Sequence, residues 1–305
     1  MPLRFAAAAL ALTLCCGAAS AAPLTVPFDL TKGEISLSVT VGGAPLYMIL
    51  DTGVDPSVID LARADALGLK VDRGGGGAAT GEGDDKQSKV FPTAIAGLSI
   101  GGHPFAAFDA LAFDMSPLSK QIGRSLDGVI GYSFLTDKIV LIDYPARTVG
   151  ILDQPSDAVP AIRACRTRWS IPLQSYKDNS IPLIPAFRFG TATAPISLDT
   201  GANSGIALYQ GALDLPGMRA ALVENGEKVY MGARGKGHAK TYLLKQPVGF
   251  GPFTLPAGQT VAVYPGAGSA DTRLANIGNP FFAQMKLKIL FNYRSRLMTF
   301  YGDCR

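Results

Sequence analysis

Short runs of alternating apolar and polar residues, divided by glycine and proline, extend along most of the chain. The apolar positions Ile35, Leu37, Val39 and Val41 alternate with polar ones, and a pair of glycines follows them. This period of two predicts a half-buried strand and a turn. Further strands are predicted at residues 46–50, 94–100, 105–113, 139–144 and 149–152, and in the second half at 184–189, 194–198, 248–255, 261–264, 287–293 and 296–301. The chain is therefore expected to be mostly β.

Helical segments are few and short in this pattern. Asp60 is suited to cap a helix that runs through Leu67, where a glycine follows. A second brief helix is predicted at Tyr132–Leu135. Asn279 followed by Pro280 provides a good N-cap and first helical residue for a third.

Two polar, glycine-bearing segments interrupt the strands. Residues 73–89 cannot pack a core, so they form either a mobile hairpin or a plain linker. Residues 227–245 are predicted to form a hairpin. Basic residues flank this hairpin and either favour acidic substrates or form a solvated surface, which the usual exposure of lysine and arginine favours; they are Lys228, Arg234, Lys236, His238 and Lys240.

One arrangement occurs twice: an apolar strand that ends in Asp-Thr-Gly. The aspartate of the first copy is Asp51, and that of the second is Asp199, 148 residues later. A charge at the end of a buried strand is costly unless it is hydrogen-bonded or functional. Its repetition predicts that two carboxyl groups face each other.

The spacing of later residues extends this repeat. Gly131 lies 80 residues after Asp51, and Gly278 lies 79 after Asp199. Tyrosines follow the two aspartates by 93 and 94 residues. Two segments of one architecture in tandem predict pseudo-twofold symmetry, with an N-terminal lobe at residues 22–160 and a C-terminal lobe at 161–305.

Composition agrees with a folded two-lobed chain. Its 305 residues can bury a large core, and 48% are apolar, against 17% charged. The 35 glycines and 21 prolines favour an all-β interpretation. A scattered net charge of +4 gives no support for a nucleic-acid surface.

The first 21 residues have the features of a signal peptide. Arg4 supplies the positive end, an apolar run follows, and Ala19, Ser20 and Ala21 form a small-residue cleavage site. The run is too short to cross a bilayer comfortably, and no later stretch resembles a membrane helix. We expect export to the periplasm or the medium, which is favoured over a lipid anchor at Cys15 or Cys16.

Removal of this segment leaves two cysteines, Cys165 and Cys304. In an oxidising compartment such a pair is expected to form one disulfide. The alternative is two unpaired, buried thiols.

Several reaction classes are excluded or made improbable by missing residues. The chain has two histidines, His103 and His238, in unrelated settings, so a His-Glu-x-x-His zinc site is excluded and a multi-histidine metal centre is improbable. The sequence contains no Gly-x-Ser-x-Gly nucleophile motif and no phosphate-binding glycine loop between strand and helix. We expect no metal and no cofactor.

Two carboxyl groups in contact provide their own chemistry. Like-charge repulsion raises one apparent pKa, and the pair shares a proton. The ionised member can then take a proton from water, while the protonated member donates to the carbonyl oxygen that the water attacks. This is general acid–base hydrolysis without a covalent intermediate.

The chain resembles the pepsin-like and retropepsin-like aspartic proteases, with both lobes in one polypeptide. The resemblance covers nearly all of the chain after the signal peptide and rests on four motifs: Leu50–Gly53, Leu198–Gly201, Val129–Gly131 and Asn276–Gly278. It implies a bilobal acid protease fold, in which two pseudo-twofold-related β-barrel lobes enclose a peptide cleft.

The resemblance also implies roles for individual residues. Asp51 and Asp199 would be the catalytic pair, with Thr52 and Thr200 linking their two loops by hydrogen bonds. Gly53 and Gly201 would let the backbone approach the carboxyl groups. The elements that end at Gly131 and Gly278 would cross behind the catalytic loops, and Asn276 fits this apolar motif less well than its counterpart.

Some positions depart from the pepsin-like pattern. Val54 follows Gly53, where pepsin-like lobes usually have serine or threonine, and Ala202 is closer to the retroviral pattern. Asp55 is interpreted as a solvated turn residue unless it faces the cleft. Pepsin-like enzymes also carry a tyrosine in the flap, a hairpin of the first lobe. Residues 73–89 contain no tyrosine, so Tyr230 of the second hairpin either takes over this role or packs in the core or at the surface.

The leading hypothesis is an exported, monomeric aspartic endopeptidase that acts on polypeptides. The alternative is a catalytically silent module of the same fold that binds a peptide or protein. Both aspartates stand in good sequence context, which favours hydrolysis.

Overall fold

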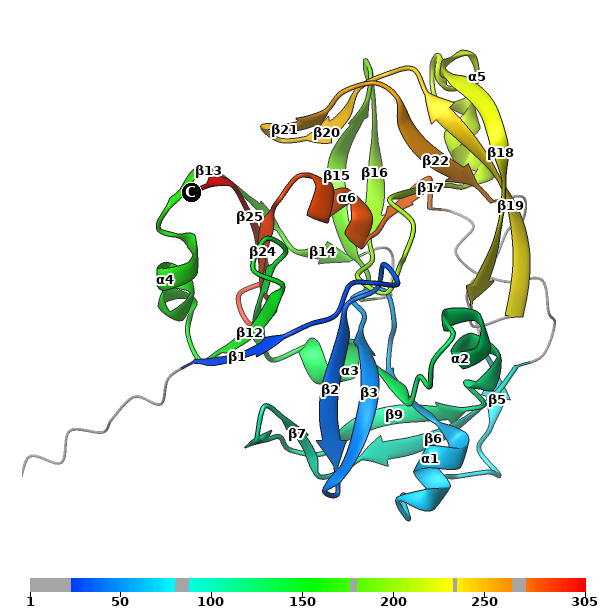
Figure 1. Cartoon of the computed structure of the whole chain (residues 1–305), viewed down its shortest axis with the longest axis vertical. Helices are drawn as coiled ribbons and strands as arrows, with labels where there is room; N and C mark the ends of the chain where they lie inside the picture. The colour runs from blue at the N-terminus through cyan, green and yellow to red at the C-terminus, as the bar shows by residue number, and fades with distance from the viewer. Residues whose placement is uncertain (1–22, 80–87, 176–179, 233–234, 265–272) are drawn as a thin grey trace, which may run out of the picture.

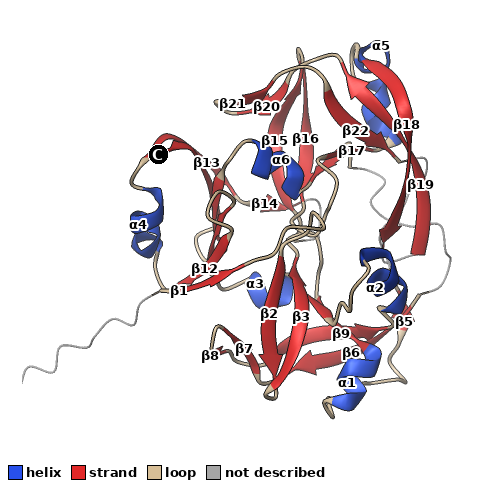
Figure 2. Ribbon diagram, in the orientation of Figure 1, coloured by secondary structure: helices blue, strands red, loops and turns tan. Residues whose placement is uncertain are grey.

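The computed structural model of the chain describes residues 23–79, 88–175, 180–232, 235–264 and 273–305. The expected signal peptide and residues 80–87 of the polar segment lie outside these ranges. The fold is mostly β with a few short helices, as predicted, and Figures 1 and 2 show two β-rich bodies above and below a central loop region. Most described strands belong to three sheets.

The first half of the chain forms a nine-stranded sheet in the order β5-β6-β9-β4-β10-β3-β2-β7-β8. Its strands are β2 (Ser36–Val41), β3 (Ala44–Leu50), β4 (Ser57–Asp60), β5 (Gly77–Ala78), β6 (Lys89–Ile95), β7 (Leu98–Ile100), β8 (His103–Pro104), β9 (Phe108–Phe113) and β10 (Gly128–Ile130). Gly77 and Ala78 of β5 pair with Val90 and Lys89 of β6, so the described ends of the polar segment lie side by side, which favours a hairpin over a plain linker.

The second half forms a matching sheet in the order β18-β19-β22-β17-β23-β16-β15-β20-β21. Its strands are β15 (Pro182–Phe189), β16 (Ala192–Leu198), β17 (Ile206–Leu208), β18 (Leu222–Gly232), β19 (Gly235–Leu244), β20 (Val248–Phe250), β21 (Phe253–Leu255), β22 (Gln259–Val263) and β23 (Ala275–Ile277), and β14 (Gln174–Ser175) pairs with β15. The predicted hairpin at 227–245 is present and begins five residues earlier. Figure 1 shows this hairpin reaching towards α2 of the first half, where β18 and α2 are in contact.

A six-stranded sheet joins the two halves in the order β1-β12-β11-β24-β25-β13. Its strands are β1 (Leu24–Pro27), β11 (Ile139–Asp143), β12 (Thr148–Leu152), β13 (Cys165–Pro172), β24 (Lys288–Asn292) and β25 (Leu297–Cys304). The central pair, β11 and β24, is antiparallel, with Leu141 opposite Leu290. The strands that close each half in sequence therefore pair across the pseudo-twofold axis.

The helices are short and lie at strand ends. They are α1 (Leu61–Ala66), α2 (Ser116–Ile122), α3 (Tyr132–Leu135), α4 (Val159–Ile162), α5 (Met218–Ala221) and α6 (Asn279–Gln284), with 3₁₀ turns at Pro155–Ala158 and Gln210–Asp214. Asp60 caps α1 as predicted, since its side chain accepts from the N–H of Arg63. The N-cap of α6 is Gly278, so the prediction that Asn279 is the cap was wrong by one residue. The Asn279 side chain is buried and bonded elsewhere.

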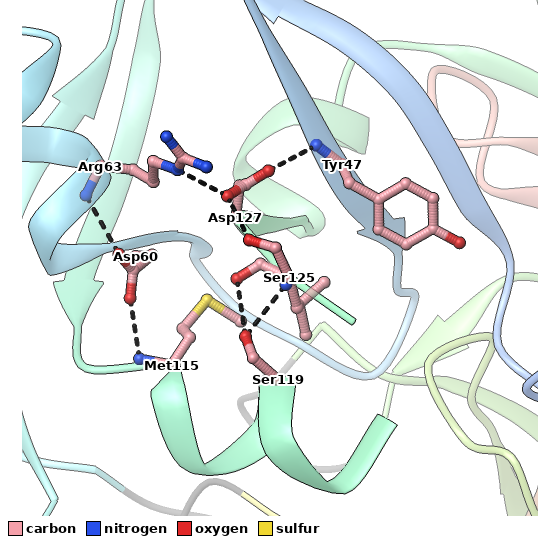
Figure 3. A network of polar contacts seen from close by, with 8 residues as sticks. Tyr47, Asp60, Arg63, Met115, Ser119, Ser125 and Asp127 are labelled. Atoms are coloured by element: carbon pink, nitrogen blue, oxygen red, sulfur yellow. Dashed lines mark hydrogen bonds and ion pairs between the residues drawn. The ribbon is translucent and has the colours of Figure 1, made fainter. Parts of the chain in front are cut away.

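A buried carboxylate, Asp127, fixes β10 against β3 (Figure 3). Its oxygens accept from the N–H of Tyr47 at 2.8 Å, from Nε of Arg63 at 2.7 Å and from the hydroxyl of Ser125 at 2.9 Å. The backbone of Asp127 also pairs with Tyr47 and Asp60. This network sets the register of the strand that leads to Gly131.

The predicted disulfide is present. Cys165 and Cys304 lie opposite each other on β13 and β25 and are bonded. The bond links the middle of the chain to its last residues across 139 positions. The alternative of two free thiols was wrong.

Candidate active site

Asp51 and Asp199 occupy equivalent positions in the two halves, each directly after the last residue of a buried strand. Asp51 follows β3, which pairs in parallel with β10, and its N–H donates to the carbonyl of Ile130 at 2.9 Å. Asp199 follows β16, which pairs in parallel with β23, and its N–H donates to the carbonyl of Ile277 at 2.9 Å. The repeat seen in the sequence is thus also a repeat in hydrogen bonding.

Thr52 and Thr200 cross-link the two loops. The hydroxyl of Thr200 accepts from the N–H of Thr52 at 3.0 Å and donates to the carbonyl of Leu50 at 2.8 Å. The hydroxyl of Thr52 accepts from the N–H of Thr200 at 3.1 Å and donates to the carbonyl of Leu198 at 3.2 Å. Both threonines are buried, so these four bonds hold the loops in one relative position.

Glycine is required beside each carboxyl group. A Cβ atom on Gly53 would lie 2.6 Å from the carboxyl carbon of Asp199, and one on Gly201 would lie 2.0 Å from Oδ2 of Asp51. Each glycine therefore packs against the aspartate of the other half. Both aspartates retain partial exposure to solvent.

The pKa of Asp51 is raised well above its ordinary value of 3.8. Burial is the largest cause, followed by the negative charge of Asp199 and a hydrogen bond shared with the Asp199 carboxyl group. The backbone N–H groups of Gly53 and Gly201 oppose the shift less strongly. Asp51 is therefore suited to retain a proton at pH values where an ordinary aspartate has lost it.

Asp199 has a side-chain donor as well as backbone donors. Its Oδ1 accepts from the N–H groups of Gly201 at 2.9 Å and Ala202 at 3.1 Å, and its Oδ2 accepts from Nδ2 of Asn276 at 2.8 Å. Several N–H donors around one carboxylate stabilise its charged form. The residue in the equivalent position of the first half is Val129, which has no polar side chain to offer Asp51.

A short chain of side chains holds the Asn276 amide in this orientation. Oδ1 of Asn276 accepts from the hydroxyl of Ser197 at 2.8 Å, and that hydroxyl accepts from Arg273 at 3.2 Å. All three residues are buried. Sequence reasoning noted Asn276 only as a poor fit to an apolar motif, although a polar residue in a buried strand is itself a signal of function.

Gly131 and Gly278 lie directly behind the two loops. A Cβ atom on Gly131 would lie 2.6 Å from the carbonyl oxygen of Val54, and one on Gly278 would lie 2.4 Å from that of Ala202. No larger residue fits at either position without moving the loop.

Asn279 connects the two halves beside the pair, a role that sequence reasoning missed. Its Nδ2 donates to the carbonyls of Thr200 at 2.6 Å and Gly33 at 3.0 Å, and its Oδ1 accepts from the buried hydroxyl of Tyr144 at 2.7 Å. Burial raises the pKa of Tyr144 well above its ordinary value, so this hydroxyl stays a donor.

Asp55 and Tyr230, whose roles the sequence left open, each contact a residue outside the aspartate pair. Asp55 is exposed and accepts a hydrogen bond from Ser180. Tyr230 packs on Tyr264, with ring centroids 4.4 Å apart, and belongs to a small cluster on the second sheet. This packing corresponds to the second of the two alternatives for Tyr230.

In the described ranges, no three side chains of histidine, cysteine, aspartate or glutamate lie together as a metal-binding group. None of the helices described is both long and apolar enough to cross a membrane.

This paired arrangement agrees with a comparison of the sequence with known families. Residues 37–134 match the aspartyl protease family. The match covers about a third of the chain and includes β3, Asp51, β10 and Gly131. No curated protein matches the chain. The match therefore supports a relationship to aspartic proteases for the half of the chain that contains Asp51. The second half repeats the geometry of the first around Asp199.

Proposed function

We propose that the protein is an exported aspartic endopeptidase built from lobes at residues 22–160 and 161–305. The observation that carries the proposal is the contact between Asp51 and Asp199, whose loops are cross-linked by Thr52 and Thr200. The aspartyl protease match at residues 37–134 supports it. The disulfide agrees with export to an oxidising compartment.

In the proposed reaction the two aspartates have different roles. Asp199, with three N–H donors around it, is the ionised base that takes a proton from the attacking water. Asp51, whose pKa is raised, is the acid that donates its proton to the oxygen of the scissile carbonyl. Water adds to the carbonyl carbon. The resulting tetrahedral species then breaks its C–N bond as Asp199 gives the proton it took to the amine nitrogen and a hydroxyl of that species returns a proton to Asp51.

A peptide-library assay tests this proposal. The purified protein is incubated with a mixed library from acidic to neutral pH, with and without a hydroxyl-bearing transition-state mimic such as pepstatin. We expect new peptide termini at acidic to mildly acidic pH and inhibition by the mimic. Peptides that bind but remain intact throughout this range would instead identify the silent binding module.

A further inference from the structure

The basic residues of the β18–β19 hairpin divide between its two faces. Lys236, His238 and Lys240 alternate along β19 and are exposed, and Lys240 pairs with Glu224 at 3.0 Å. Lys228 lies opposite Ala239, a buried residue of the other face, and is itself only partly exposed. It therefore points inward, unlike the other three.

The face that carries Lys228 is continuous with the face that touches Asp199. Directly paired residues share a face, and the pairs Asn276–Ala207, Ala207–Ala262 and Ala262–Thr241 cross the sheet from β23 to β19. Asn276 donates to Asp199. Four strand spacings of about 4.8 Å place β18 roughly 19 Å from β23.

A cavity of about 450 Å³ lies beside Lys228. Ser204, Thr241 and Gln259 contribute polar groups to its wall, while Ile206 and Phe281 contribute apolar surface. The wall formed by residues 203–205 begins four residues after Asp199. An extended peptide advances about 3.3 Å per residue, so a side chain within roughly six residues of the bond at the aspartates can reach this cavity.

The charge of Lys228 has no carboxylate partner among the described residues. Its Nζ lies 6.0 Å from the centre of the Tyr264 ring. Burial lowers the pKa of Lys228. A partly buried ammonium group without a counter-charge favours a ligand that supplies one.

We propose that this cavity is a subsite for an acidic side chain, glutamate or aspartate, of the peptide substrate. Lys228 pairs with the carboxylate, the hydroxyl and amide groups of Ser204, Thr241 and Gln259 complete its hydrogen bonds, and Ile206 and Phe281 contact the methylene groups. The proposal rests on the proposed endopeptidase function and adds a substrate class to it.

Matched peptides test the subsite. Each pair differs only by glutamate or glutamine at one position, every C-terminus is amidated, and cleavage is measured at about pH 5.5, above the usual glutamate pKa of ~4.3. We expect one position at which glutamate raises kcat/KM by about tenfold, as a charge-assisted hydrogen bond supplies. Lys228→Met removes this preference, while Lys236→Met, on the outer face of the same hairpin, retains it.

A binding measurement separates this proposal from the proposed function. Fluorescent forms of the same peptides are titrated with the Asp51→Asn variant, and with Asp51→Asn combined with Lys228→Met. We expect tighter binding of the glutamate peptide, lost with Lys228, whether or not the parent protein cleaves. Equal affinity for the glutamate and glutamine peptides at every position, or a glutamate preference that is retained in the Lys228→Met variant, would overturn the proposed subsite.

Discussion

At the scale of single residues, the two halves of the site are symmetric in backbone and different in chemistry. The sequence predicted Asp51 and Asp199 because Asp-Thr-Gly after an apolar strand is recognisable in one dimension. It did not predict the hydrogen bond from Asn276 to Asp199, because a strand pattern does not reveal which side chain reaches across to the next loop. Asn279 was misplaced for a related reason: its sequence resembles a helix cap, but its amide is used between the halves.

The Asn276 amide is expected to affect both the pH dependence and the rate of hydrolysis by the aspartate pair. Asn276→Val, which copies the residue of the other half, removes a charge-assisted donor from Asp199, so the acidic limb of the kcat/KM–pH profile should move to higher pH and the maximum should fall about tenfold. The control is Val129→Ala, which removes no hydrogen bond and should leave that limb in place. An acidic limb unchanged by Asn276→Val would remove this positioning role.

At the scale of strands and helices, alternation of apolar and polar residues predicted where most strands lie but not which strands pair. The strands at 139–143 and 288–292 were expected from their sequence, yet each was expected to close its own half. They pair with each other, because long-range partners are chosen by packing across the axis and not by local periodicity. The same limit applies to Asp127, whose donors come from positions as far apart as Tyr47 and Ser125.

Asp127→Asn should weaken the link between β10 and β3. The amide replaces an oxygen that accepts from Arg63 or Tyr47, so a partly buried donor loses its partner, at a cost of about 1–3 kcal/mol. Urea unfolding measures the change in unfolding free energy. Asp65→Asn breaks the exposed pair with Arg73 and should cost less than about 1 kcal/mol, so equal losses in both variants would contradict the network's importance.

At the scale of the whole molecule, the buried carboxyl group of Glu34 makes the stability of the fold depend on pH. Glu34 is 2% exposed, and neither of its carboxyl oxygens has a hydrogen-bond partner. Burial raises its pKa above the ordinary 4.5 and nearby Asp29 adds to the rise, while its own backbone N–H, Arg124 and Lys32 oppose it. The folded state therefore binds the proton more tightly than the unfolded state, so stability is full below about pH 4.5 and falls as pH rises through the folded pKa.

Glu34→Gln should flatten this dependence. The variant cannot ionise, so its melting temperature should exceed that of the parent at neutral pH and approach it in acid, as measured by thermal melts from pH 3 to 8. Glu224→Gln changes an exposed residue and should melt like the parent throughout. Parallel melting curves for Glu34→Gln and the parent at every pH would show that Glu34 has no such effect.

The central claim is that Asp51 and Asp199 together hydrolyse peptide bonds. It is tested most directly by kcat/KM for one quenched peptide, measured side by side for the parent, Asp51→Asn and Asp199→Asn. We predict a loss of about 10²–10⁴-fold in each variant, with circular dichroism and melting that show a retained fold. Cleavage at the parent rate by either folded variant would contradict the account.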